Sequence, residues 1–265
     1  MDIQATEERL KAIVEEFGPW TNHNIRLAPN LYTMGASPSG AEVKLKRFMQ
    51  IVSDFFGEDF SRLRVLDLAC LEGLYGLELA MQGAQVVGIE GRESNLAKAR
   101  FVRETLGIEN IEFYCDDVRN LSREKYGSFD VVLCIGIFYH LDAPDVFRFA
   151  EDISEVCSRL AIFDTHVSQT ADRTYEYRGR EYEGRSYTED HTAWGSIDNE
   201  ESAWLTRPSL YGLLNDVGFA SVYECHLPVV PKYVELRSNK QADRSTFIAV
   251  KNRSIFLKTT DLADG

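Results

Sequence analysis

The sequence lacks a long apolar run and a leader-like start. Its longest stretch without a polar side chain, Val131 to Tyr139, is less than half the length of a helix that spans a bilayer. The first residues, MDIQATEERLKAIVEEF, are acidic, whereas a secretory signal is basic and then apolar. We therefore expect a soluble, unexported, cytoplasmic protein with no membrane partner.

Cysteine and proline are scarce. The chain has 5 cysteines and 7 prolines in 265 residues, and no low-complexity tract or linker rich in glycine and serine. The cysteine spacing is unlike that of zinc sites or redox pairs, so we expect reduced thiols and no bound metal. An apolar share of 44% excludes a disordered or collagen-like chain.

Basic residues are fewer than acidic residues. There are 29 basic and 42 acidic residues, which gives a formal net charge of −13. Affinity for nucleic acid depends largely on cations that neutralise phosphates, so the composition disfavours nucleic acid as a partner. We expect a small-molecule substrate; nothing in the sequence indicates the oligomeric state.

The apolar pattern divides the chain into four parts. Residues 1–60 predict a helical N-terminal extension, with one helix that ends near Phe17 and another from Ser39 to Phe56. Residues 61–167 alternate short β-branched runs with amphipathic segments, which is typical of parallel strands covered by helices. Residues 168–206 show no clean periodicity, and we interpret them as an insertion that covers the site as a lid.

Residues 207–265 complete the same domain. They predict a helix from Arg207 to Asp216 and two runs that pair in antiparallel fashion, 221–230 and 244–253. The expected fold is therefore α/β, with about seven mostly parallel strands, a final antiparallel strand, and the insertion after the fifth strand. The five earlier strands are predicted at 64–70, 85–91, 111–117, 129–137 and 159–167.

The turn after the first of these strands lacks the glycines of a dinucleotide site. The three small-residue positions of a G-x-G-x-x-G motif are Ala69, Leu71 and Gly73 here. This disfavours an oxidoreductase that uses a nicotinamide dinucleotide.

Acidic residues follow the strands instead. They are Asp67, Glu72, Glu90, Asp116 and Asp117. In an open α/β sheet the ligand lies at the carboxyl ends of the strands. A ring of acids there would repel pyrophosphate but would hold a sulfonium, an ammonium and ribose hydroxyls, which together describe S-adenosylmethionine.

Four motifs in residues 61–165 resemble those of class I S-adenosylmethionine-dependent methyltransferases, and the likeness of the fold extends to about residue 253. The resemblance implies a Rossmann-like fold and methyl transfer from S-adenosyl-L-methionine, with S-adenosyl-L-homocysteine as product. VLDLACLEG resembles the first motif, so Asp67 and the following turn would hold the methionine end. Glu90 resembles the acid that accepts both ribose hydroxyls.

The other two motifs complete the implied cofactor site. Asp117 would accept from the adenine amino group, and the Val118 backbone N–H would contact the ring. FDVVLCIGIFYHL resembles the fourth motif, whose backbone near Cys134 and Ile135 would line the cofactor. The predicted cofactor-binding residues are Asp67, Ala69, Cys70, Glu72, Gly73, Glu90, Gly91, Asp116, Asp117, Val118, Cys134 and Ile135.

Two histidines are candidates for the general base. His140 follows the fourth strand, and histidine is suited to proton transfer near neutral pH. His166 alternates with Asp164, so an aspartate could orient it; with His191 the two could instead bind a metal. The predicted substrate-binding residues are Trp20, His23, Tyr139, Asp164, Trp194 and Trp204.

The preferred reading is methyl transfer to a small molecule, at oxygen, by in-line displacement with a histidine base. One alternative is a methyl or carboxymethyl transferase that modifies tRNA, because PWTNHNIRL and GIFYHL resemble bacterial enzymes that act on the wobble uridine. Another is a non-catalytic cofactor-binding or scaffold protein, because Ala69 and Leu71 stand where the first motif of the family usually has glycines.

Overall fold

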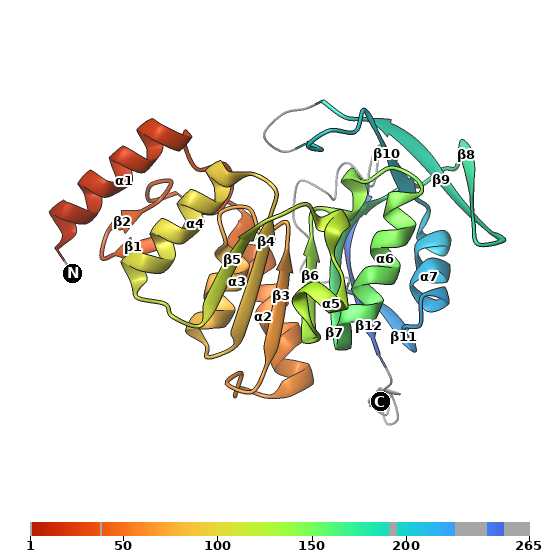
Figure 1. Ribbon diagram of the computed structural model, residues 1–265, viewed down its shortest axis with the longest axis horizontal. Coiled ribbons are helices and arrows are strands. Elements are labelled where there is room, and N and C mark those ends of the chain that lie inside the picture. The colour runs from red at the N-terminus through yellow and green to blue at the C-terminus, as the bar shows by residue number, and fades with distance from the viewer. Residues whose placement is uncertain (1, 38, 191–194, 226–242, 252–265) are drawn as a thin grey trace, which may run out of the picture.

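The central sheet of the protein follows the predicted α/β pattern (Figure 1). The computed structural model describes residues 2–37, 39–190, 195–225 and 243–251. Within them the sheet has seven strands in the order β11-β12-β7-β6-β3-β4-β5. The strands are β3 (Arg64–Leu68), β4 (Gln85–Glu90), β5 (Ile111–Cys115), β6 (Phe129–Ile135), β7 (Cys157–Val167), β11 (Ser221–Cys225) and β12 (Asp243–Val250).

Pairing in this sheet is parallel except at β12. The strands β5, β4, β3, β6 and β7 pair in parallel, whereas β12 runs antiparallel to both β7 and β11. This confirms the predicted, mostly parallel sheet with a final antiparallel strand. The strand order reverses between β3 and β6, which creates a crevice at their carboxyl ends.

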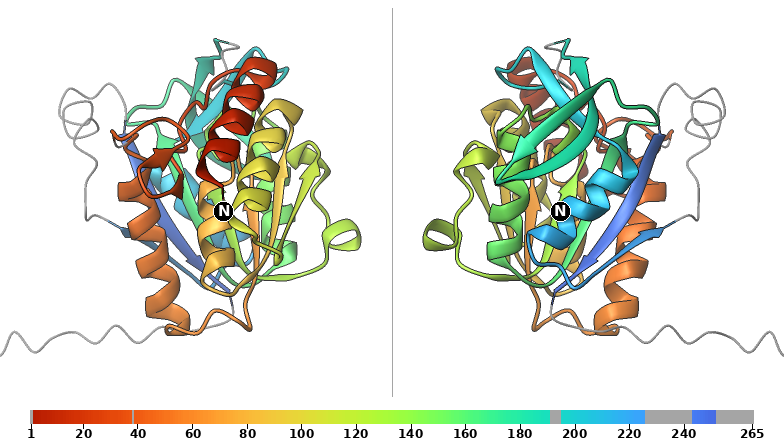
Figure 2. Two further views of the ribbon diagram at one scale, coloured as in Figure 1. Left: turned by 90° about the vertical axis from the view of Figure 1, so that its left-hand side faces the viewer. Right: turned by 90° about the vertical axis from the view of Figure 1, so that its right-hand side faces the viewer.

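Helices cover both faces of the sheet. On one face α2, α3 and α4 pack against side chains such as Val65 and Leu133, and on the other α6 and α7 pack against Leu66 and Phe163. The right-hand view of Figure 2 shows α2 in orange and α6 in green on opposite sides. The helices are α1 (Ile3–Phe17), α2 (Ala41–Phe56), α3 (Leu74–Met81), α4 (Glu93–Leu106), α5 (Arg123–Tyr126), α6 (Asp145–Val156) and α7 (Arg207–Asp216), with short 3-10 turns η1 (Val118–Asn120) and η2 (Phe138–His140).

Two small antiparallel sheets lie outside the central one, and the sequence pattern predicted neither. The N-terminal extension contains a hairpin, β1 (Arg26–Ala28) and β2 (Leu31–Tyr32). The insertion folds into β8 (Arg173–Tyr177), β9 (Arg180–Thr188) and β10 (Glu201–Leu205), which project at the upper right of Figure 1.

Aromatic packing attaches the insertion to the domain. The Phe147 ring of α6 lies 5.1 Å from the Tyr177 and Tyr182 rings, measured between centroids. The Ala203 N–H donates to the Leu141 carbonyl oxygen at 2.8 Å, which joins β10 to the chain after η2. Within the described residues, no helix has the length and apolar character needed to cross a membrane.

Gly88 should be required for the packing of β4 against β5. A Cβ at this position would lie 2.7 Å from Cδ1 of Phe113, its partner across the strand pair, and 3.0 Å from Sγ of Cys70. We expect Gly88→Ala to lower the free energy of unfolding by about 1 to 3 kcal/mol because of overpacking. Gly212 in α7 has nothing within 4 Å of such an atom. Gly212→Ala should therefore raise the free energy of unfolding by about 1 kcal/mol. Urea unfolding measures both, and equal stability of the two variants would contradict the argument.

Candidate active site

A cavity of about 780 Å³ lies at the carboxyl edge of the sheet. The tips of β3, β4 and β5 supply Ala69, Glu90 and Asp117, and the segments at β6 and β7 supply His140 and His166. These two groups come from opposite sides of the strand-order reversal. The N-terminal extension and the insertion provide further walls, and the volume is in the range of small-molecule sites.

The turn after β3 adopts the left-handed conformation without glycine. Ala69 and Leu71 both have φ of +51°, a region that costs a residue with a side chain about 1 to 2 kcal/mol. The Glu90 carboxylate offsets part of this cost, because its Oε2 accepts from the Leu71 N–H at 3.0 Å. Both turn residues line the cavity.

Glu90 is a buried acid on the cavity wall. Its Oε1 accepts from the Arg92 N–H at 2.9 Å and from Asn95 Nδ2 at 3.2 Å. Burial raises its pKa above the ordinary value, while these hydrogen bonds oppose the rise. An ionised carboxylate has about four acceptor positions, so the three internal donors leave room for a hydroxyl of a ligand.

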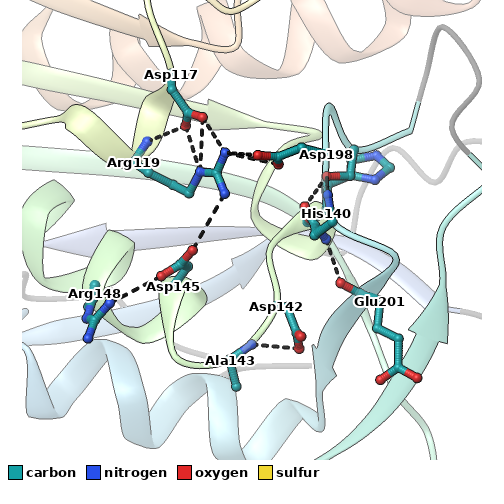
Figure 3. Close-up of polar contacts among 11 residues, drawn as sticks. Asp117, Arg119, His140, Asp142, Ala143, Asp145, Arg148, Asp198 and Glu201 are labelled. Carbon is teal, nitrogen blue, oxygen red and sulfur yellow. Dashed lines mark hydrogen bonds and ion pairs between the residues drawn. The ribbon is translucent and has the colours of Figure 1, made fainter.

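Asp117 also lines the cavity, and Arg119 holds its carboxylate (Figure 3). The Arg119 Nε lies 3.0 Å from both Asp117 oxygens, and its Nη2 lies 2.8 Å from Oδ2 of Asp198 in the insertion. Arg119 Nη1 lies 3.7 Å from Asp145. This arginine therefore connects the tip of β5 to the insertion.

Three of the predicted acids do not line the cavity. Asp67 accepts from the Gly76 N–H at 2.9 Å, and burial raises its pKa to about 7. Glu72 accepts from the N–H and hydroxyl of Thr21 at 2.6 and 2.7 Å, so it attaches the N-terminal extension to the turn. Asp116 binds Lys125, Tyr126 and Asn120. Their contact with a cofactor stays a prediction.

The remaining predicted cofactor residues divide between the cavity wall and the interior. Gly91, Val118 and Ile135 line the cavity. Cys70 and Cys134 are buried, and neither they nor Gly73 line it. The structure therefore brings six of the predicted cofactor residues to the cavity wall, namely Ala69, Glu90, Gly91, Asp117, Val118 and Ile135. Leu71, which was not predicted, lies beside them.

His140 has a carboxylate partner from the insertion. Its Nδ1 lies 3.0 Å from each oxygen of Glu189. Burial raises the pKa of Glu189, but the hydrogen bond and the charge of His140 outweigh it and lower the pKa below its ordinary value. Both side chains line the cavity.

His166 and Asp164 have different surroundings. Burial lowers the pKa of His166 to about 3, and the positive charge of Arg244 adds to the effect. The Asp164 carboxylate accepts from Lys44 Nζ at 2.8 Å, Arg244 Nε at 2.6 Å and the Thr246 hydroxyl at 3.0 Å. Burial opposes ionisation of Asp164, yet the two cations hold its pKa well below its usual range. Glu189, and not Asp164, is the carboxylate bonded to His140.

Aromatic rings stack beside these histidines. The Trp204 ring lies 4.7 Å from His166 and 4.4 Å from Tyr187, nearly parallel to both. Its Nε1 donates to the Tyr139 carbonyl oxygen at 3.0 Å, and the Tyr139 hydroxyl accepts from Arg244 Nη1 at 2.8 Å. All of these residues line the cavity.

The other predicted substrate residues differ in position. His23 lines the cavity, and its Nδ1 accepts from the Leu74 N–H at 3.2 Å, with burial lowering its pKa to about 4. Trp20 does not line it and packs against Phe101 and Lys98. Trp194 and the possible metal ligand His191 lie outside the described residues. In the described part of the chain, no three His, Cys, Asp or Glu side chains are grouped to hold a metal ion.

Sequence reasoning missed several cavity residues. Each of them has a partner far away in the chain, so spacing gave no signal for that contact; Arg119 also bonds Asp117, two residues before it. They are Lys44, Arg119, Glu189, Asp198 and Arg244.

The fold and the matches to known proteins define the class of this chain. Residues 65–159 match the family described as "Methyltransferase domain". Together with the Rossmann-like sheet, this match places in residues 65–159 a methyltransferase domain with the fold of the class that uses S-adenosylmethionine.

Individual relatives share parts or nearly all of the chain. The ubiquinone biosynthesis O-methyltransferase of Acinetobacter baumannii is 35% identical over 104 residues, which cover 39% of this chain and 41% of that protein. A 23S rRNA (uracil(1939)-C(5))-methyltransferase of Shewanella amazonensis is 43% identical over 72 residues, 26% of this chain and 16% of that protein. The crystal structure of the N-terminal domain of EvdMO1, in the presence of SAH and D-fucose, aligns with a TM-score of 0.73 and 25% identity, over 95% of this chain and 98% of that one.

The described residues fit S-adenosylmethionine. Glu90 retains an acceptor position at the cavity wall, and Val118, Ile135 and Leu71 offer apolar surface near the two acids. Asp117 would share its oxygens between Arg119 and an adenine amino group.

The ion pair between Arg119 and Asp198 should slow release of the cofactor product. Asp198→Asn removes the charge that holds the insertion to the tip of β5, and an exposed pair of this kind contributes about 0.2 to 1 kcal/mol. We expect the dissociation rate of S-adenosylhomocysteine, measured by stopped flow, to rise by about 1.4- to 5-fold. Asp145→Asn, which removes a contact of Arg119 outside the insertion, is the matched control and should leave the rate unchanged. Equal rates in all three proteins would contradict a role for the insertion.

Proposed function

We propose that this protein transfers a methyl group from S-adenosylmethionine to a hydroxyl oxygen of a small molecule, with His140 as the general base. The observation that carries the proposal is that two groups of residues line the same cavity. It has Glu90 and Asp117 on one side of the strand-order reversal and the His140–Glu189 pair on the other. A methyl donor and a proton acceptor would therefore meet in the same space.

The relatives support an oxygen acceptor. The Acinetobacter relative is named an O-methyltransferase, and the EvdMO1 domain was crystallised in the presence of SAH and D-fucose, a molecule rich in hydroxyl groups. The Acinetobacter relative shares only part of its length with this chain, whereas the EvdMO1 domain aligns along nearly all of it. Hydroxyl compounds, with D-fucose among them, are therefore the first acceptors to test.

When bound, S-adenosylmethionine supplies a methyl group that its sulfonium has already activated, so the chain mainly aligns the reactants. Glu90 and Asp117 would hold the methyl donor, which would supply its methyl group to the acceptor oxygen and keep the electron pair of the carbon–sulfur bond on its sulfur. His140 accepts the hydroxyl proton at Nε2 and later releases it to water. The stacked rings of Trp204 and Tyr187 limit the entry of water.

His140 suits this role better than His166. A general base works best when its pKa is near the operating pH, and the pKa of His166 is lowered to about 3. His140 has the carboxylate of Glu189 at 3.0 Å, which stabilises the imidazolium formed after proton transfer.

Methylation of nucleic acid is the second candidate. One relative is named as an rRNA methyltransferase, but the match covers only 16% of it. The net charge of −13 opposes binding of a polyanion. A small-molecule acceptor is the better supported of the two.

Glu90 should determine affinity for the cofactor. Glu90→Ala removes the acceptor of ribose hydroxyls, and we expect affinity for S-adenosylhomocysteine in isothermal titration to fall by about 2 to 4 kcal/mol. Glu93→Ala, an exposed acid in the first turn of α4, is the control and should bind like the wild type. Glu90→Gln keeps the shape and should fold if the alanine variant does not. Unchanged affinity in the Glu90 variants would remove this residue from the site.

His140 should affect turnover and not cofactor binding. We expect His140→Ala to slow the formation of S-adenosylhomocysteine from S-adenosylmethionine and an acceptor by about 100-fold or more. The affinity for S-adenosylhomocysteine should stay within 2-fold of the wild type, a range of about 0.4 kcal/mol. An equal loss of turnover and affinity would show a structural role. Wild-type protein that is folded but binds no S-adenosylhomocysteine would refute the proposed function as a whole.

A further inference from the structure

We propose that Glu189 is the positioning residue of the base: it fixes the proton of His140 on Nδ1, so that Nε2 is free to accept. Residues 195–199, which also contact the cofactor half of the cavity, hold Glu189 in place. We refer to residues 195–199 as the strap. The inference rests on the proposed role of His140 and adds a residue that no sequence motif indicates.

The contacts of Glu189 allow one arrangement of protons. Both of its oxygens lie 3.0 Å from Nδ1 of His140, and its side chain is only 1% exposed. An ionised carboxylate accepts hydrogen bonds and donates none. The Nδ1 atom must therefore carry the hydrogen, which leaves Nε2 as the acceptor of a neutral ring.

The strap holds Glu189 from the other side. The Ser196 N–H donates to Oε2 of Glu189 at 3.0 Å, and the Asn199 amide donates to the His140 carbonyl oxygen at 3.0 Å. The Glu189 N–H donates to the Glu200 carbonyl oxygen at 2.9 Å, just past the strap. Base and carboxylate are thus both attached to the same short segment.

The strap also touches the cofactor half of the cavity. Arg92 Nη2 donates to the carbonyl oxygens of residues 195 and 196 at 3.1 and 3.3 Å, and Asp198 pairs with Arg119. A Cβ on Gly91 would lie 2.4 Å from Cδ1, the terminal carbon of the Ile197 side chain, so the strap packs closely against the residue that follows β4. The strap therefore contacts the cofactor half of the cavity and the carboxylate that bonds the base at the same time.

The tautomer of His140 tests the inference without an acceptor. In Glu189→Gln the amide oxygen should take the position that faces the Ser196 N–H, which places the amide NH₂ against Nδ1 of His140. Two donors repel, so we expect the hydrogen of the ring to move to Nε2. The 15N chemical shifts of the histidine rings, recorded above their titration range and assigned with His140→Ala, report which nitrogen is protonated.

Two further variants complete the experiment. Glu189→Ala removes the carboxylate and should release the ring to the Nε2–H form that histidine prefers in water, and it serves if the glutamine variant does not fold. Glu200→Gln, the same chemical change at an exposed position of the insertion, should keep the wild-type Nδ1–H form. A His140 that stays protonated on Nδ1 in both Glu189 variants, or that has its hydrogen on Nε2 in the wild type, overturns the inference.

This result is separable from the proposed function. Once an acceptor is known, Glu189→Gln should lower kcat by at least 10-fold and leave the affinity for S-adenosylhomocysteine unchanged. Tautomer control by Glu189 together with no methyl transfer by the wild type would refute the function and keep the His140–Glu189 assignment. Normal turnover in Glu189→Gln with a switched tautomer would refute the positioning role and keep the function.

Discussion

The parallel register of β5, β4, β3, β6 and β7 is the constraint on which the site depends. Because these strands run in the same direction, all of their carboxyl ends meet at one edge of the sheet, and the order reverses between β3 and β6. Residues such as Glu90 and His140, far apart in the chain, therefore line one cavity. The helices on both faces keep the strands buried, so the edge can carry strained turns and charged side chains.

Environment gives the carboxylates of this edge different properties. Burial raises the pKa of Asp67 to about 7, whereas Arg244 and Lys44 overcome the same effect at Asp164 and hold that pKa low. Glu72 is equally buried, but it bonds Thr21 and fastens the N-terminal extension. Acids that look alike in the sequence thus serve the turn, the extension or the cavity, according to the donors that tertiary packing brings to them.

The insertion contributes chemistry as well as cover. It supplies Glu189 to His140 and Asp198 to Arg119, and its Trp204 stacks on His166. Segments of this kind, carried by a rigid sheet, are where proteins that share a fold differ most.

The sequence by itself determined the α/β class, the strands of the sheet and the acids at its edge. Buried parallel strands require near-continuous apolar runs, and the chain places Glu90 at the end of one such strand and Asp117 just beyond another. It did not reveal the strands of the insertion, whose exposed faces carry mixed polar and aromatic residues without a clear period. Only the tertiary structure decided which carboxylate meets which histidine. Glu189 and His140 are 49 residues apart in the chain. A hydrogen bond between residues that far apart leaves no periodic pattern in the sequence.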